Sequence, residues 1–262
     1  MKRGISLYFH YISVIIRSTM QYKMSFLLSI IGQFLISFNV FLGIYFMFIR
    51  FNEVKGYTYS EVLLCFSIML MEFSLAECFA RGFDGFSSIV RNGEFDRIMV
   101  RPRSPILQVL GSRFELSRIG RMLQAVVMFV YGITASGITW TLSRVITVVF
   151  MLIGGTMLFT GIFMIYAALC FFTLEGLEFM NVFTDGAREY GKYPFDVYGK
   201  NILRLCTFVV PYTLVQYYPL QYLLGRTESP YYIIYPLGTV FFLAVCYGVW
   251  RYGLRHYKSN GS

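Results

Sequence analysis

Few residues of this sequence have the types and spacing that catalysis or metal binding requires. The two histidines, His10 and His256, lie near opposite ends of the chain, and the five cysteines stand singly in apolar segments. Zinc sites draw Cys and His ligands from short spacings, and disulfide frameworks show paired cysteines. Nor does the sequence offer a Ser, His and Asp grouping for nucleophilic catalysis. We therefore expect no catalytic residue, no metal site and no disulfide framework in this chain.

One segment imitates a nucleotide-binding loop. Residues 186–192 read GAREYGK and match the first seven positions of the phosphate-binding pattern GxxxxGK[ST]. The eighth residue is Tyr193, where that loop needs a hydroxyl of Ser or Thr to hold magnesium. An acidic amphipathic stretch also precedes it, where an apolar strand is required. We expect no cofactor to be bound by this chain.

Two carboxylates, Glu72 and Glu77, interrupt an apolar run over residues 60–80. Glu77 has Arg81 four residues on, which is the spacing of an ion pair along one helix face. Glu72 has no such neighbour. An isolated carboxylate in an apolar helix usually lies inside a bundle, so Glu72 could line a substrate path or bind a polar group on a neighbouring helix.

The composition indicates which elements must hold these residues. The chain has 262 residues, of which 56% are hydrophobic and 14% charged, whereas soluble domains carry roughly 25% charged residues. About 20 apolar residues suffice for a helix to cross a bilayer. Runs with few or no charges predict an all-α, polytopic integral membrane protein with six transmembrane helices, over residues 24–49, 60–80, 122–143, 145–174, 205–225 and 229–250.

The basic residues are distributed unevenly between the two sides. Residues 81–121 carry eight arginines, and further basic residues lie in residues 1–23 and 251–262. The opposite loops hold Arg50, Lys55, Arg144 and Arg226. Positive loops stay in the cytoplasm, so we expect both termini, the tail 251–262 and the loop 81–121 on the cytoplasmic side of a bacterial plasma (inner) membrane. The net charge of +9 then reflects topology and attraction to anionic lipids, and we expect no nucleic-acid partner.

Two segments flank the predicted spans. Residues 1–23 combine apolar and basic residues and predict a helix in the cytoplasmic interface, or alternatively a frayed tail. The apolar run that follows is too long for a signal peptide, so we expect it to stay attached. Residues 175–204 mix charges of both signs. They could form a cytoplasmic loop, or a polar membrane helix followed by a re-entrant hairpin around Pro211 and Pro219.

The loop 81–121 alternates glycines, charges and an apolar strip. Such a segment suits a short amphipathic helix that docks onto a protein, although a solvated basic loop held by lipid headgroups is an alternative. Ser104 and Pro105 predict a helix start, with Ser as the cap and Pro at the first position, and the helix could run on to Arg121.

Three stretches of this sequence resemble the membrane subunits of type-2 ABC exporters. Residues 92–96 (NGEFD) and 101–105 (RPRSP) are similar to a Gly-x-Leu-Asp and Arg-Pro pattern after the second span, with Phe95 in place of leucine. Tyr193-Pro194, Pro211 and Tyr218-Pro219 resemble the proline-spaced region before the last span. The tail WRYGLRHYKSNGS, residues 250–262, resembles the ending of the subgroup that includes viologen and multidrug export permeases.

The resemblance implies a single permease domain over residues 1–262, with a re-entrant hairpin before the last span. It implies a permease that forms half of the substrate pathway, pairs with a second permease subunit as a homo- or heterodimer, and binds separate cytoplasmic ATPase subunits. ATP and Mg²⁺ would bind on those partners. The residues at or beside the ATPase contact would be Gly93, Glu94, Asp96, Arg101 and Pro102. A non-transporting membrane scaffold or assembly protein is the alternative, and an intramembrane enzyme is disfavoured by the missing catalytic group.

Overall fold

The computed structural model describes residues 2–173 and 178–259, and over these residues the chain is built of helices. Apart from one isolated bridge between Val54 and Tyr57, the described residues contain no β-structure. The all-α fold predicted from the apolar runs is therefore confirmed. Residues 174–177, at the start of the mixed-charge segment, and 260–262, at the end of the tail, lie outside the described residues.

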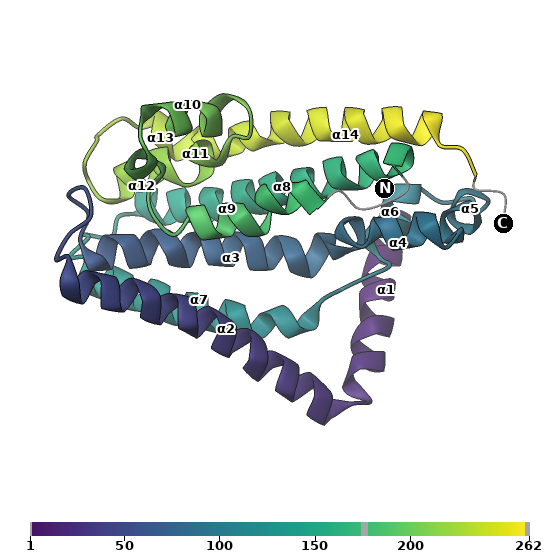
Figure 1. Cartoon of the computed structure of the whole chain (residues 1–262), viewed down its shortest axis with the longest axis horizontal. Coiled ribbons are helices and arrows are strands. Elements are labelled where there is room, and N and C mark those ends of the chain that lie inside the picture. The colour runs from purple at the N-terminus through teal and green to yellow at the C-terminus, as the bar shows by residue number, and fades with distance from the viewer. Residues whose placement is uncertain (1, 174–177, 260–262) are drawn as a thin grey trace.

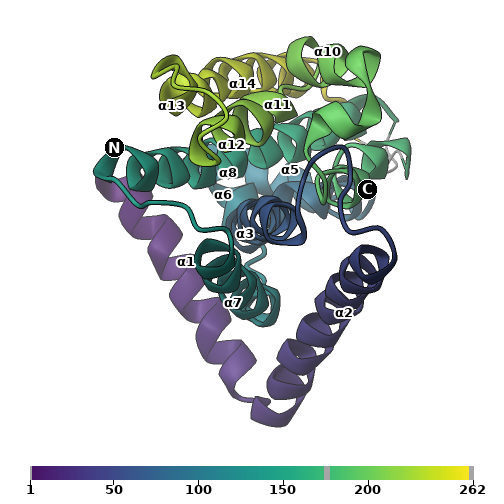
Figure 2. The same cartoon turned by 90° about the vertical axis from the view of Figure 1, so that its left-hand side faces the viewer.

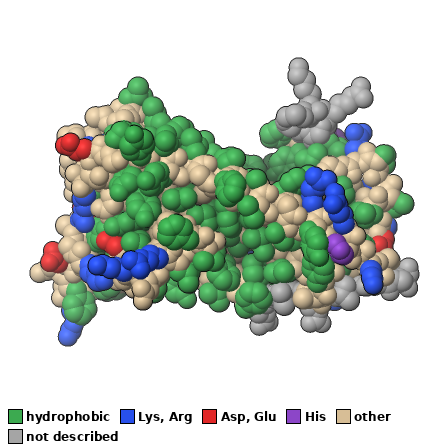
Figure 3. All heavy atoms as spheres, turned by 90° about the horizontal axis from the view of Figure 1, so that it is seen from above, with side chains coloured by type: hydrophobic (Ala, Val, Ile, Leu, Met, Phe, Trp, Pro, Cys, Tyr) green, Lys and Arg blue, Asp and Glu red, His purple; other side chains and the backbone are tan. Residues whose placement is uncertain are grey.

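Five long helical stretches of the described chain are apolar and long enough to cross a membrane. They contain α2 (Lys23–Arg50), α3 (Tyr59–Asp84), α7 (Ile119–Ala135), α8 (Leu142–Thr173) and α14 (Thr239–His256). Helix α3 lies in the centre, against α7 on one side and α8 on the other, and α14 packs along α8 (Figures 1 and 2). The chain is thus a multi-pass membrane protein. Figure 3 agrees, since apolar side chains cover the middle of the face that carries α14 and charged side chains lie towards its two ends.

The chain between α8 and α14 is broken into short helices. They are η2 (Glu178–Val182), α9 (Asp185–Tyr190), η3 (Phe195–Tyr198), α10 (Lys200–Phe208), α11 (Tyr212–Val215), α12 (Tyr217–Leu223), α13 (Tyr231–Ile234) and η4 (Tyr235–Gly238). Residues 205–225 form no continuous helix, because Pro211 lacks an N–H and restricts the residue before it. Helices α8 and α14 run in the same direction in Figure 1, so the chain returns along the bundle between them. The sixth crossing and the re-entrant hairpin stay predictions.

The first helix, α1 (Lys2–Met20), lies across the long axis of the bundle (Figure 1). It packs against α2 and α6 (Pro105–Leu110). The hydroxyl of Tyr8 donates a hydrogen bond to the carbonyl of Phe79 at 2.9 Å. The predicted helix over residues 1–23 is therefore present over Lys2–Met20, and its direction suits a helix lying along a membrane surface. Its place in the membrane interface stays a prediction.

Aromatic side chains fill the core at the arginine-rich end of the bundle. Phe83, Phe86, Phe95 and Trp250 are fully buried there, and Phe171 of α8 lies among them. The ring of Trp250 lies 5.2 Å from that of Phe83, 5.1 Å from that of Phe86 and 5.0 Å from that of Phe171. This cluster joins the end of α14 to α3, α8 and the loop that follows α3.

Candidate functional site

The loop between α3 and α7 folds into short helices at one end of the bundle. They are α4 (Phe86–Arg91), α5 (Glu94–Met99), α6 (Pro105–Leu110) and η1 (Leu116–Arg118). Gly93 precedes α5 with φ of +69°, a left-handed conformation that glycine adopts without strain. Ser104 and Pro105 stand at the start of α6 as predicted, although the Ser104 side chain makes no capping hydrogen bond. The expected continuation to Arg121 is wrong, because α6 ends at Leu110 and the next α-helix begins at Ile119.

Helix α5 is amphipathic, and one large side chain anchors it. Phe95 is 0% exposed, and its ring lies 5.1 Å from that of Phe86, 5.2 Å from that of Phe171 and 5.0 Å from that of Tyr257, all near-perpendicular or edge-on. Edge-to-face aromatic pairs add about 0.5–1.5 kcal/mol beyond their buried area. Phe95, which stands where the resembling family has leucine, therefore packs among aromatic rings.

The opposite side of α5 and the turn after it are exposed. We call this the α5 surface; its residues are Glu94, Arg97, Met99, Val100, Arg101 and Pro102. Val100 is 82% exposed, although it is apolar, and arginines surround it in the sequence. Beside it lies a depression of about 350 Å³ lined by both polar and apolar side chains, to which α1 contributes Tyr11. An exposed apolar tip with a charged rim is typical of a protein-binding surface.

One buried amide holds the exposed turn in place. The side chain of Gln108 on α6 donates hydrogen bonds to the carbonyls of Ile98, at 3.1 Å, and Arg103, at 3.2 Å. These two carbonyls bracket residues 99–102, so Gln108 closes the turn from inside. Gln108 was not among the residues predicted from the sequence. One signal in the sequence could have indicated it, because Gln108 is the one polar side chain in the apolar segment 105–110 that Pro105 begins.

Asp96 faces the C-terminal tail. Its Oδ1 accepts a hydrogen bond from the Tyr257 hydroxyl at 3.0 Å, and its Oδ2 accepts one from the Ser259 hydroxyl at 2.7 Å. Burial, followed by the hydrogen bond to Asp96, raises the pKa of Tyr257 to about 12, so this hydroxyl stays protonated and donates at neutral pH. Of the five predicted contact residues, Glu94, Arg101 and Pro102 are exposed, Gly93 shapes the turn, and Asp96 is engaged within the chain.

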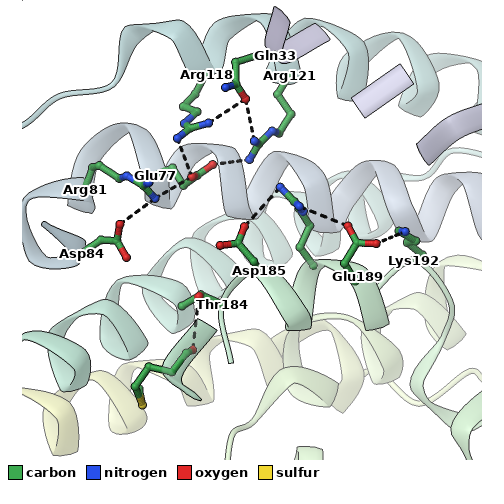
Figure 4. Close-up of polar contacts among 12 residues, drawn as sticks. Gln33, Glu77, Arg81, Asp84, Arg118, Arg121, Thr184, Asp185, Glu189 and Lys192 are labelled. Atoms are coloured by element: carbon green, nitrogen blue, oxygen red, sulfur yellow. Dashed lines mark hydrogen bonds and ion pairs between the residues drawn. The ribbon is translucent and has the colours of Figure 1, made fainter. Parts of the chain in front are cut away.

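Glu77 forms the centre of a buried charge cluster where α3, α7 and α2 meet (Figure 4). Its Oε1 lies 3.0 Å from Arg81 and 3.2 Å from Arg118, and its Oε2 pairs with Arg121. The Oε1 of Gln33 on α2 accepts hydrogen bonds from Arg118 and Arg121, both at 2.8 Å. The predicted pair of Glu77 with Arg81 is confirmed. Its other partners, Arg118 of η1 and Arg121 of α7, lie far along the sequence and were not predicted, nor was Gln33 of α2, which contacts both of these arginines.

Glu72 lies apart from this cluster, in the middle of α3. It is 0% exposed, and within residues 2–173 and 178–259 neither carboxylate oxygen has a hydrogen-bond partner. It packs on Gly155 of α8 so closely that a Cβ added to this glycine would lie 2.2 Å from the Glu72 Cδ. The structure thus places Glu72 inside the bundle as predicted, and its part in a substrate path stays a prediction.

The segment that imitates a nucleotide-binding loop is folded differently from one. Residues 185–190 form helix α9, and Lys192 pairs with Glu189 rather than facing an open loop (Figure 4). Arg188 on the same helix lies 3.6 Å from Asp185 and 3.3 Å from Glu189. In the described part of the chain, His, Cys, Asp and Glu form no group of three or more that could hold a metal ion.

Comparison with known proteins gave one match. A family model described as "ABC-2 family transporter protein" matches residues 9–261, which is almost the whole chain. No curated protein and no solved structure matches the chain.

Proposed function

The chain belongs to the ABC-2 family of transporter proteins and is a permease component of an ABC transporter; we propose that it is the membrane subunit of an exporter powered by separate cytoplasmic ATPase subunits. ABC-2 permeases are membrane components and are not themselves catalytic. ATP and Mg²⁺ then bind on the partners. This chain supplies half of the substrate pathway and pairs with a second permease, identical or related.

The α5 surface is the observation that carries this proposal. Glu94, Arg97 and Arg101 offer charges to a partner, while Phe95 on the opposite side of the same short helix is embedded in the aromatic core. Packed interiors are stiff, so a displacement of α5 is passed to α8 through Phe171 and not absorbed locally. Closure of an ATPase dimer would push residues 84–104 and switch the permease dimer between inward and outward access.

The proposed orientation puts the α5 surface in the cytoplasm. It rests on the arginines of residues 81–121 and on the basic residues of the tail, which lie at the same end of the bundle as α5 (Figure 1). Loops rich in Lys and Arg stay on the cytoplasmic side of the plasma membrane. The same charges favour anionic lipid headgroups beside the ATPase contact.

Co-purification with the ATPase subunit tests the contact directly. We expect Glu94→Lys and Arg101→Glu to weaken capture of the ATPase by about tenfold each, because both reverse a charge at the rim of the contact. Capture by the unsubstituted chain should also weaken as salt is raised, since exposed charges are screened over about 8 Å at physiological ionic strength. Glu228→Lys is the matched control, because Glu228 is exposed and lies between α12 and α13, two helices at the opposite end of the bundle from α5 (Figure 1).

Unchanged capture by both reversed variants would contradict the contact. If the chain is a non-transporting scaffold, vesicles that contain the complex should show no transport that depends on ATP hydrolysis by the partner. Vesicles containing the complex, prepared with active and with hydrolysis-deficient ATPase, separate these two functions.

We place Glu72 beside the substrate path. Its carboxylate is buried without a hydrogen-bond partner in the described chain. Burying such a group inside a membrane protein is costly, and ionisable residues kept there usually belong to a functional site. The chemistry suits a cationic or polar group on an otherwise apolar compound. Cells expressing Glu72→Gln should lose resistance to methyl viologen, whereas Glu228→Gln should keep it. Equal resistance in both variants would remove Glu72 from the path.

A further inference from the structure

The end of the chain folds back onto the loop between α3 and α7. Helix α14 ends at His256, and Tyr257 continues in an extended conformation with φ of −61° and ψ of 130°. This brings the Tyr257 and Ser259 hydroxyls to the two oxygens of Asp96, at 3.0 and 2.7 Å. The two hydrogen bonds join residues that are 161 and 163 positions apart in the sequence.

Ring packing supports the same attachment. The Tyr257 ring lies 5.0 Å from that of Phe95, at 87°, and 5.6 Å from that of Phe171. One turn earlier, Gly253 lets α14 approach α8, because a Cβ added there would lie 2.7 Å from the Phe171 Cδ2. The tail therefore contacts α5 in two ways. The Tyr257 ring packs on Phe95, and the hydroxyls of Tyr257 and Ser259 donate hydrogen bonds to Asp96.

Asp96 is the third residue of α5 and lies next to Phe95, so the two tail contacts restrain the helix at adjacent positions. Hydrogen bonds to a carboxylate are stronger than neutral ones. Residues of the α5 surface, such as Glu94 and Arg101, make no such contact with the tail within residues 2–173 and 178–259, and they stay available to a partner.

We propose that Tyr257 and Ser259 are positioning residues that strap α5 to the end of α14, so that a partner pressing on the α5 surface moves the last membrane helix together with α5. The proposal rests on the proposed function for the identity of that partner. The strap itself is a property of this chain alone. It gives the tail motif of residues 250–262 a physical role that its sequence does not reveal.

The distance between α5 and α14 measures the strap in the purified full chain. Spin labels on Val100→Cys and Arg255→Cys, both exposed, report this distance by pulsed electron resonance in lipid nanodiscs, with Cys78 replaced by Ala. Tyr257→Phe combined with Ser259→Ala removes both hydroxyls and keeps the ring on Phe95. We expect the fraction of molecules with a displaced α5 to rise about threefold to tenfold.

Further variants separate hydrogen bonding from general loss of structure. Tyr252→Phe also removes a tyrosine hydroxyl from α14, but that ring packs on Phe172 and His256 and should leave the distance distribution unchanged. Asp96→Asn retains one acceptor oxygen and should give an intermediate distribution. Asp96→Ala should add little to the variant that already lacks both hydroxyls, because all three groups belong to one contact. An unchanged distribution in the variant lacking both hydroxyls would overturn the strap.

The effect on coupling is measured with the partner ATPase present. In vesicles, the variant lacking both hydroxyls should show about threefold less ATP turnover per bound ATPase than the unsubstituted complex. An unchanged rate of ATP turnover in this variant would contradict the proposal that the contact of Tyr257 and Ser259 with Asp96 transmits movement from α5 to α14. If Glu94→Lys and Arg101→Glu leave ATPase capture intact, the proposed function fails while the spin-label result still decides the strap.

Discussion

Glu77 on α3 and Arg118 at the start of α7 lie 3.2 Å apart and join two membrane helices through a buried ion pair. Arg81 and Arg121 pair with the same carboxylate, so a single acidic side chain contacts three arginines, of which Arg81 also pairs with Asp84 at 3.0 Å. Removing a partner from a buried pair leaves an uncompensated charge, which costs more than the pair itself contributes.

We expect Glu77→Gln to lower the free energy of unfolding by about 3–5 kcal/mol, because the largely buried Arg118 and Arg121 would lose their counter-charge, whereas Arg81 would keep its pair with Asp84. The measurement is thermal or denaturant unfolding of the purified chain in detergent. Glu189→Gln is the control. Its side chain is 42% exposed in pairs with Arg188 and Lys192, so its loss should cost about 1 kcal/mol or less. Equal losses in the two variants would show that the Glu77 cluster does not stabilise the bundle.

Gly155→Ala should destabilise the chain by about 1–3 kcal/mol, because the added methyl group would overlap the carboxyl group of Glu72. Glu72→Ala clears that space, so the double variant should be more stable than the sum of the two single effects predicts. Gly43→Ala on α2 has open space around it and should be neutral or slightly stabilising. The measurement is again unfolding in detergent. A Gly155→Ala loss that persists undiminished in the Glu72→Ala background would mean that another contact causes it.

Gln108→Leu should loosen the exposed turn after α5, since it removes the hydrogen bonds to Ile98 and Arg103 while keeping a similar side-chain volume. We expect trypsin to cleave after Arg103 about tenfold faster. The protease cuts the turn when it is locally open, and the population of the open form rises as the free energy of local opening falls. The bond after Arg101 precedes proline and is a poor trypsin site, so the product should be a single new pair of fragments. Gln21→Leu, on an exposed residue between α1 and α2, should leave the rate unchanged. A rate for Gln108→Leu equal to that control would show that the amide does not hold the turn.

Cysteine labelling tests the orientation of the chain. Glu53 and Val100 are both exposed, and they lie in the loop after α2 and in the turn after α5, towards opposite ends of the bundle (Figure 1). In a Cys78→Ala background, a membrane-impermeant maleimide added to intact spheroplasts should label Glu53→Cys and should label Val100→Cys only after permeabilisation. The remaining native cysteines are buried and serve as an internal check on background labelling. Labelling of Val100→Cys from outside would place the α5 surface on the wrong side for a cytoplasmic ATPase.

Much of the helical framework could be predicted from the sequence. A backbone in lipid must satisfy its own polar groups, so a charge-free run of sufficient length has to be helical. Five of the six predicted runs overlap the long helices α2, α3, α7, α8 and α14, with differences at the ends, since α14 begins only at Thr239. The start of α6 at Ser104 and Pro105 and the pair of Glu77 with Arg81 were also predictable, because both depend on residues within one helical turn.

Hydropathy could not predict that residues 205–225 are divided into short helices, because it measures how apolar a segment is and not where its backbone turns. Pro211 offered a signal, but a proline can also be accommodated in a membrane helix when neighbouring groups replace the lost hydrogen bond. The family resemblance, rather than composition, favoured a broken segment there.

The sequence by itself determined five of the long apolar helices and the basic character of residues 81–121, and it favoured a short amphipathic helix within that loop. The tertiary structure alone decided that Arg118 and Arg121 converge on Glu77 while both also donate to Gln33. It also decided that the hydroxyls of Tyr257 and Ser259 donate hydrogen bonds to Asp96. The physical reason is the range of the interactions. Helix formation and partition into lipid follow from nearby residues, whereas the partner of a charge or a hydroxyl depends on which helices pack together, and that is a property of the whole bundle.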